Sequence, residues 1–176
     1  MIGRNDYVEK IVKKPIKIDL HIHSVFSNHK DGKKVAFNTT DNIPVLVSKM
    51  KQKGVEMCAI TDHDRFDFKI YKALKEHEGK ELLKVLPGVE FSVNFDGKNI
   101  IHIVTIFDDK DDKKLKNLEQ IFNDGIGKEQ YIDNAYSRET YFAILRAINI
   151  DFVMIAHQKK TPTSVQKPHK SDVMCL

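Results

Sequence analysis

Three histidines stand close together near the start of the chain, in the run Asp19-Leu20-His21-Ile22-His23-Ser24-Val25-Phe26-Ser27-Asn28-His29. Residues two apart on a β-strand point to the same face. His21 and His23 are therefore expected to project together, while their apolar neighbours pack on the other face. Two imidazoles on one face at the end of a strand can chelate a divalent metal ion. His29 follows a turn and can reach the same place from a loop, so this run predicts a metal site.

Further candidate ligands occur at or near the ends of apolar runs. In α/β barrels, functional residues collect at the C-terminal ends of strands. A lone histidine is usually an ordinary core or surface residue, but recurrence at equivalent places in successive strands is hard to attribute to chance. His77 and His169 are expected to be solvated. The further candidates are His63 after residues 58–62, Glu90 after the Pro87-Gly88 turn, His102 within residues 100–104 and His157 after residues 152–156.

The candidate ligands are imidazole and carboxylate groups, without cysteine. This set suits Zn, Mn or Fe in a catalytic centre and argues against a structural zinc knuckle. Seven candidate groups exceed the four that a tetrahedral ion uses, which implies two or three ions with Glu90 as a natural bridge. Clustered ions polarise phosphoryl oxygens and activate water near neutral pH, so the matching reaction is phosphoester hydrolysis. Asp62 and Asp64 flank His63, and one of them can orient a ligand or assist proton transfer. Asp64 can equally cap the following helix.

Strand and helix signals alternate along the chain. This alternation predicts an α/β fold with parallel strands and outer helices, either as a barrel or as an open sheet. The third and fourth strands are joined by too few residues for a crossover helix, which predicts a hairpin. One domain is expected over residues 1–158, followed by a basic, extended or poorly ordered tail over residues 159–176. Strands are predicted at residues 16–23, 55–61, 82–95, 99–107 and 151–156, and helices at residues 43–53, 66–77, 114–122 and 137–148.

The overall composition is ordinary for a globular protein. The 176 residues include 29 Lys and Arg against 25 Asp and Glu, a net charge of +4, which by itself does not indicate nucleic acid. No apolar run approaches the roughly 20 residues that span a bilayer, and residues 1–14 lack a signal-peptide pattern. Cys58 and Cys175 make no disulfide or metal-binding pattern, and Cys58 is expected in the core. A cytoplasmic protein without a membrane partner is therefore predicted.

Taken together, these motifs resemble those of the PHP (polymerase and histidinol phosphatase) superfamily, roughly over residues 16–158. The run Asp19 to Ser24 is similar to the first motif, which supplies two ligands to one metal, and His29 stands where many members place a ligand to a second metal. Thr61-Asp62-His63 resembles the second motif, with His63 a ligand. Pro87-Gly88-Val89-Glu90 resembles the third, with Glu90 bridging two metals. His102 and Ala156-His157 resemble the later motifs that complete a third site. The resemblance implies a distorted seven-stranded β/α barrel around two or three ions.

The resemblance also implies hydrolysis of phosphomonoesters, nucleotides or nucleic acid. We expect a metal-dependent phosphoesterase that uses metal-activated water, with Asp62, Glu90 and His157 as catalytic residues. Lys30, Lys33, Arg65 and Lys159 lie close in sequence to ligand positions, where they can either contact substrate phosphate or serve as ordinary surface cations; Lys30, Arg65 and Lys159 are the phosphate candidates. The expected metal ligands are His21, His23, His29, His63, Glu90, His102 and His157.

One departure from the family concerns its late Asp-x-His motif, which does not occur after residue 158. The chain is therefore expected to be a truncated form, to take the missing wall from another subunit, or to hold an incomplete site. Residues 155–163 also resemble a bacterial branch in which the domain precedes an ATPase module. The expected partners are a phosphoester substrate, a second copy of the chain or an ATPase module. The alternative function is a non-catalytic metal-binding or interaction module.

Overall fold

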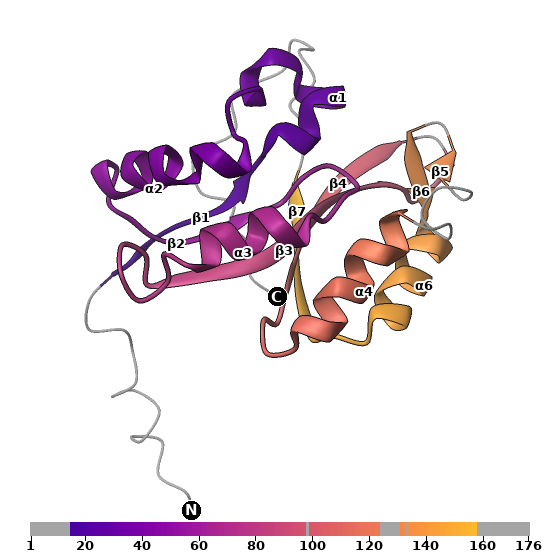
Figure 1. Cartoon of the computed structure of the whole chain (residues 1–176). Coiled ribbons are helices and arrows are strands. Elements are labelled where there is room, and N and C mark those ends of the chain that lie inside the picture. The colour runs from indigo at the N-terminus through magenta and orange to yellow at the C-terminus, as the bar shows by residue number, and fades with distance from the viewer. Residues whose placement is uncertain (1–14, 98, 124–130, 133, 158–176) are drawn as a thin grey trace, which may run out of the picture.

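A single curled sheet forms the centre of the molecule. The computed structural model describes residues 15–97, 99–123, 131–132 and 134–157. The first three strands are parallel, whereas β4 runs antiparallel to both β3 and β7. The sheet curls into half of a barrel. The mixture of helices and strands confirms the predicted α/β class. The antiparallel pairing of β3 with β4 confirms the predicted hairpin between the third and fourth strands. The strands lie in the order β1 (Lys17–Ile22), β2 (Val55–Ile60), β3 (Lys84–Asn94), β4 (Ile100–Phe107) and β7 (Phe152–His157), with β5 (Tyr131–Ile132) and β6 (Ala135–Ser137) beside β3 (Figure 1).

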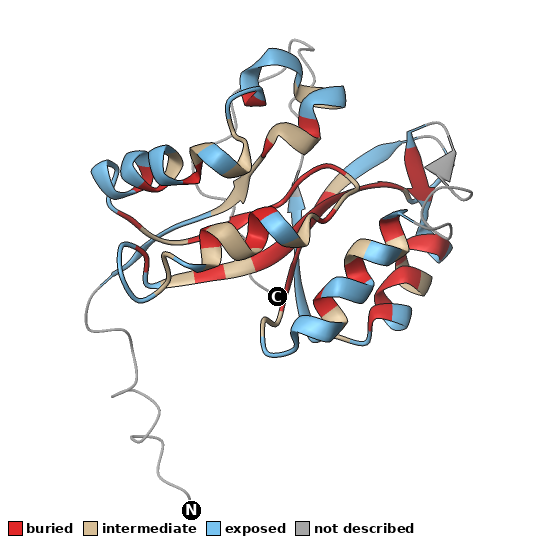
Figure 2. Ribbon diagram, viewed as in Figure 1, coloured by how far each residue is buried: buried red, intermediate tan, exposed pale blue. Residues whose placement is uncertain are grey.

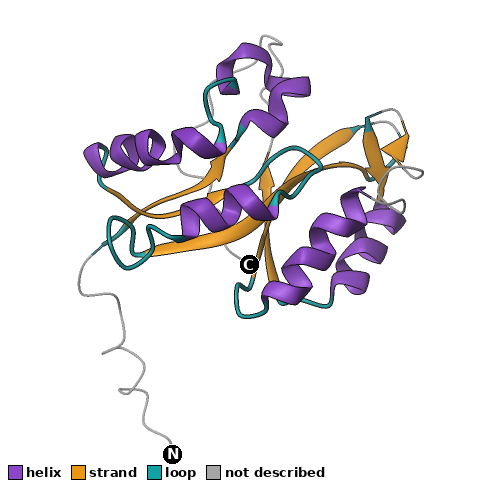
Figure 3. Ribbon diagram, viewed as in Figure 1, coloured by secondary structure: helices purple, strands orange, loops and turns teal. Residues whose placement is uncertain are grey.

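Four longer helices pack on one face of the sheet: α2 (Ile43–Gln52), α3 (Phe68–Lys75), α4 (Asp112–Asn123) and α6 (Arg138–Ile148) (Figure 3). The helix starts follow local capping rules. The Asp67 carboxylate accepts a hydrogen bond from the Ile70 N–H at 2.9 Å, so α3 begins later than predicted. The Ser137 hydroxyl accepts from the Thr140 N–H at 3.1 Å and starts α6 as predicted. None of the described helices is long and apolar enough to cross a membrane.

The strands divide their side chains between two faces with a period of two. On β3, Val89 and Phe91 point into the main core under the helices, together with the fully buried Cys58 of β2. The opposite face carries a smaller apolar cluster around Ala59, Val104 and Ile106. Figure 2 shows the buried inner sides of the helices and the largely exposed strand β7. Glu90 and His102 belong by strand parity to the face away from the helices, which is where the polar site forms.

A short segment after β1 crosses the end of the sheet on its way to α2. It contains the turn Val25–Ser27, helix α1 (Asn28–Asp31) and the turn Gly32–Val35. Asn38 ties the end of this segment to the site, because its side-chain amide donates to the His23 carbonyl at 2.8 Å. None of these short elements was predicted. They carry several of the polar side chains described next.

Candidate metal centre

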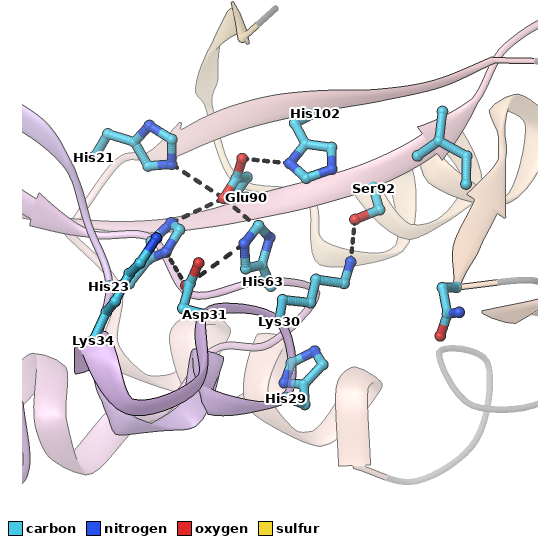
Figure 4. Close-up of a pocket in the computed structure, with 12 residues that line it drawn as sticks. His21, His23, His29, Lys30, Asp31, Lys34, His63, Glu90, Ser92 and His102 are labelled. Carbon is cyan, nitrogen blue, oxygen red and sulfur yellow. Dashed lines mark hydrogen bonds and ion pairs between the residues drawn. The ribbon is translucent and has the colours of Figure 1, made fainter. Parts of the chain in front are cut away.

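The fully buried carboxylate of Glu90 is surrounded by four imidazoles (Figure 4). Its Oε2 atom lies 3.1 Å from Nε2 of His21, 2.9 Å from Nε2 of His23 and 3.0 Å from Nδ1 of His63. Its Oε1 atom lies 2.7 Å from Nδ1 of His102. Residues on β1, β3 and β4 and just after β1 and β2 therefore meet at one carboxylate, although Glu90 lies in the middle of β3 and His102 near the start of β4 rather than at C-terminal strand ends.

Backbone pairing explains how His63 reaches this position. After β2, the chain stays against β3: the Glu90 N–H donates to the Asp62 carbonyl at 3.0 Å, and the Asp64 N–H donates to the Glu90 carbonyl at 2.9 Å. These bonds place His63 directly beside Glu90. His102 comes from the partner strand, where it pairs in register with Ser92, two residues beyond Glu90.

A second carboxylate, Asp31 of α1, completes the cluster from the side opposite Glu90. Its Oδ2 lies 2.5 Å from Nδ1 of His23 and 3.7 Å from Nε2 of His63. The rings of His23 and His63 therefore each face Glu90 with one nitrogen and Asp31 with the other nitrogen. The sequence reasoning missed Asp31 and selected His29 instead, although Asp31 is a carboxylate in the same loop and only two residues further on.

The donor atoms fit a metal better than they fit one another. Among the described residues, Nε2 of His23, Nδ1 of His63 and Oε2 of Glu90 are buried and make no aligned hydrogen bond, although the two nitrogens lie 2.9 and 3.0 Å from that oxygen. Buried polar atoms without a partner are expensive, and a cation placed among these nitrogen and oxygen atoms would satisfy them. Three overlapping groups have donor atoms within 4.8 Å of one another: His21, His23 and Glu90; His23, Asp31 and His63; and His63, Glu90 and His102.

The electrostatics favour the protonation states that metal ligands need at Glu90 and His63, but not at His23. Burial opposes ionisation of Glu90, but the adjacent imidazoles of His102, His21 and His23 outweigh it and hold its pKa well below the usual range. Burial lowers the pKa of His63 to about 4, helped by the nearby charge of His23, so this imidazole is neutral at physiological pH. Burial also acts to lower the pKa of His23, yet hydrogen bonds to Glu90 and Asp31 leave it raised. Metal binding needs ionised carboxylates and neutral imidazoles.

The predicted catalytic Asp62 occupies a different environment. It is buried, and its Oδ1 accepts from the Ser24 N–H and the Ser27 hydroxyl, both at 2.7 Å. Its Oδ2 accepts from the Ser24 hydroxyl at 2.5 Å. Burial raises the pKa of Asp62, and these hydrogen bonds act in the opposite direction. Asp62 does not line the pocket at the metal centre, so its geometry suits holding the Ser24–Ser27 turn rather than proton transfer to a substrate.

The pocket beside the cluster has a volume of about 630 Å³ and is open to solvent on one side. His29 lines it, but its Nδ1 lies 3.2 Å from the Phe26 carbonyl, and among the described residues it belongs to none of the three donor groups. Lys30 and the unpredicted Lys34 also line the pocket. The pocket therefore extends beyond the donor residues, and the ammonium groups of Lys30 and Lys34 line it on the side of α1.

The other predicted site residues are placed as follows. Arg65 lies away from the pocket, with its guanidinium carbon 4.1 Å from the Phe26 ring centroid and a 3.9 Å contact to Asp67. His157 ends β7, where its backbone pairs in register with His102. Lys159 lies outside the described residues. The expected phosphate-contacting role of Arg65 therefore has no support from its position.

Comparisons with known proteins complete the description of the site. A family model described as the PHP domain matches residues 19–160. A solved structure from Bifidobacterium adolescentis, assigned as a metal-dependent phosphoesterase, superposes with a TM-score of 0.49 at 14% identity, covering 81% of this chain and 67% of that one. An amidohydrolase from Chromobacterium violaceum, solved with bound sulfate and no metal, superposes with a TM-score of 0.38 at 24% identity, covering 62% of this chain and 34% of that one. No curated protein matches the chain in sequence.

Proposed function

The chain belongs to the PHP domain family, and from that premise we propose that it is a metal-dependent phosphoesterase that hydrolyses a phosphomonoester or phosphodiester of the nucleotide or nucleic-acid type. The observation that carries the proposal is the convergence of His21, His23 and His63 on one oxygen of the buried Glu90, at the wall of an open pocket. A cluster of this kind, exposed to a pocket, suits catalysis better than a closed structural site.

The three overlapping donor groups can hold two or three divalent ions, with Zn, Mn and Fe the candidates for this mixture of imidazole and carboxylate. Ions bound there would polarise a phosphoryl oxygen and lower the pKa of a coordinated water molecule. Glu90, His23 and His63 each belong to two of the groups, so these residues join the ion positions. Asp31 takes the place in the ligand set that we expected for His29.

The chain's own residues orient the donors and the substrate. Asp31 and Glu90 fix the ring of His23 from both nitrogens, and His102 fixes the second oxygen of Glu90. Carboxylate partners of this kind set the tautomer and the orientation of a ligating imidazole. Lys34 and Lys30, whose ammonium also pairs with the Asp64 carboxylate, line the pocket and are the described cations best placed to attract a phosphate group. We retain His157 as a proposed ligand or catalytic group because its backbone lies beside His102.

The test is turnover of p-nitrophenyl phosphate and bis-p-nitrophenyl phosphate by the full chain loaded with Zn, Mn or Fe. We expect metal-dependent hydrolysis that falls by more than about 100-fold in Glu90→Gln, since changing even an outer partner of a metal ligand costs roughly 10- to 100-fold. The matched control is Asp109→Asn, a carboxylate held by Lys75 and Lys84 outside the pocket, which should keep its activity. Metal-loaded wild-type protein that turns over neither substrate would refute the proposal.

A second candidate is a non-catalytic metal-binding module that assembles with another chain. The observation that favours it is strand β7 at the end of the sheet: in the part of the chain that the structure describes, β7 pairs only with β4. Phe152, Val153 and Met154 of this strand are 38%, 58% and 45% exposed. Uncharged edge strands favour pairing with other chains. This candidate predicts metal binding and self-association without turnover, so the same assays distinguish the two functions.

A further inference from the structure

The carboxylate of Asp64 connects three segments that surround the metal centre. Asp64 follows His63, and its side chain is 6% exposed. Its backbone φ is +51°, in the left-handed region. Residues other than glycine are uncommon there, although aspartate and asparagine are tolerated better than most. A residue keeps such a conformation when the surrounding contacts hold it in place.

The polar groups of Asp64 contact different parts of the site. Its N–H donates to the Glu90 carbonyl at 2.9 Å, and its Oδ1 accepts from the Ser92 N–H at 2.6 Å. Its Oδ2 accepts from the Lys30 ammonium at 2.7 Å, and the same ammonium donates to the Ser92 hydroxyl at 2.5 Å. Asp64 therefore joins the loop after β2, the metal-binding part of β3 and helix α1. Figure 4 shows Lys30 reaching Ser92 beside His63.

Lys30 directly precedes Asp31, so whatever holds Lys30 also sets where the Asp31 carboxylate lies. The other end of the same segment is held by Asp62, through Ser24 and Ser27. The two aspartates that flank His63 thus hold the segment 24–31 at two points. Asp62 acts at its first turn and Asp64 at its last.

We propose that Asp64 is a positioning residue: through its ion pair with Lys30, it holds α1 over the sheet and keeps Asp31 in the donor group with His23 and His63. Removing the charge of Asp64 then weakens the ion position that uses Asp31 and spares the one formed by His21, His23 and Glu90. The proposal rests on the metal site of the proposed function. It does not depend on which ester, if any, is hydrolysed.

The first test is calorimetric titration of the full metal-free chain with Mn²⁺. Asp64→Asn keeps the shape, the tolerance of positive φ and an acceptor for the Ser92 N–H, but it removes the charge facing Lys30. We expect one class of Mn²⁺ site to weaken by about 10- to 100-fold while the other is retained. The control is Asp109→Asn, because Asp109 is also a mostly buried carboxylate held by two lysines and is 14% exposed. It should bind Mn²⁺ as the wild type does.

Two further measurements separate positioning from general destabilisation. Lys30→Met should reproduce the selective loss, and Lys30→Arg should retain most of the affinity because it keeps the charge. In the metal-free protein, amide hydrogens of residues 28–31 should exchange faster in Asp64→Asn than in the wild type, while those of α4 are unchanged. If Asp64→Asn does not fold, Lys30→Met alone decides.

The proposal is overturned if Asp64→Asn and Lys30→Met bind Mn²⁺ with wild-type stoichiometry and affinity. It is also overturned if every Mn²⁺ site weakens equally, because that is the result of a structural role alone. Selective loss of one site in a protein that hydrolyses no ester would support this inference and refute the phosphoesterase proposal, so the two failures are distinguishable.

Discussion

Replacing Gly88 with alanine should displace the part of β3 that carries Glu90, because there is no room for a side chain at position 88. Gly88 lies on β3 two residues before Glu90 and on the same face of the sheet. A Cβ atom there would lie 2.7 Å from Cγ2 of Thr61, 2.8 Å from Cδ1 of Ile106 and 3.1 Å from the Thr105 carbonyl oxygen. The constraint is space alone, since Gly88 is not among the glycines with positive φ.

The magnitude follows from those distances. Carbon atoms pack at about 3.5–4.0 Å, so the new methyl group would overlap Thr61 and Ile106 by about 1 Å. Ile106 can rotate its terminal methyl group, but Thr61 is β-branched, stiff at χ1 and fully buried. Overpacking of this kind costs about 1–3 kcal/mol. For a chain of 176 residues this corresponds to a fall in Tm of about 2–12 °C.

The assay is thermal unfolding followed by circular dichroism, together with metal content by mass spectrometry. Gly88→Ala should unfold earlier and retain less metal, because the strand must move where it carries Glu90. The matched control is Gly54→Ala after α2, where φ is +71° and a new Cβ atom would have no other atom within 4 Å, so it should lose stability through backbone strain and keep its metal. A Gly88→Ala variant whose Tm falls by less than about 2 °C, the lower end of the expected range, and that keeps its full metal content would refute the packing argument.

Three other predictions test separate parts of the structure. Asp31→Asn should lose at least one bound ion, as counted by mass spectrometry. The His29→Ala variant should keep the wild-type metal content, because His29 lies outside the three donor groups of the described residues. Equal losses of metal in the two variants would contradict the assignment of Asp31 as a ligand. Dialysis against a chelator should lower Tm by about 5–11 °C, because a ligand at 100 times its Kd stabilises the folded protein by about 2.7 kcal/mol. Adding Mn²⁺ should restore the original Tm. An unchanged Tm after dialysis would argue against a bound ion. Burial opposes ionisation of Asp109, but Lys75 and Lys84 outweigh it and hold its pKa below the ordinary value. Its contribution to stability is therefore present above about pH 4 and is lost as the pH falls through the lower folded-state pKa. Denaturant titrations between pH 5 and 2.5, a range that brackets the ordinary carboxyl pKa, measure the free energy of unfolding. This free energy should fall less steeply with decreasing pH for Asp109→Asn than for the wild type. Parallel curves for the two proteins would contradict the prediction.

Local patterns in the sequence were enough to predict the α/β class and which histidines share a face. His21 and His23 share a face because strands repeat every two residues, and this holds wherever the strand lies. The short connection between residues 94 and 100 made the hairpin of β3 and β4 predictable, since a crossover helix needs more chain. The start of α6 was predicted to within one residue, because the Ser137 cap bonds to Thr140 only three residues on. In each case the interaction joins residues that are close in sequence.

The composition of the cluster depended on contacts between distant segments, and there the prediction from sequence was incomplete. Asp31 and His29 lie on the same short helix, and only its placement over the sheet decides which one faces His23 and His63. The Asp62 carboxylate turns to Ser24 and Ser27, and Arg65 stacks on Phe26, because those partners are brought near by packing of the segment after β1. The sequence by itself thus determined which kinds of donor atom the protein offers and near which strands most of them lie. Only the tertiary structure decided which of them meet, because the direction of a side chain on a short irregular segment is set by contacts with residues far away in the chain.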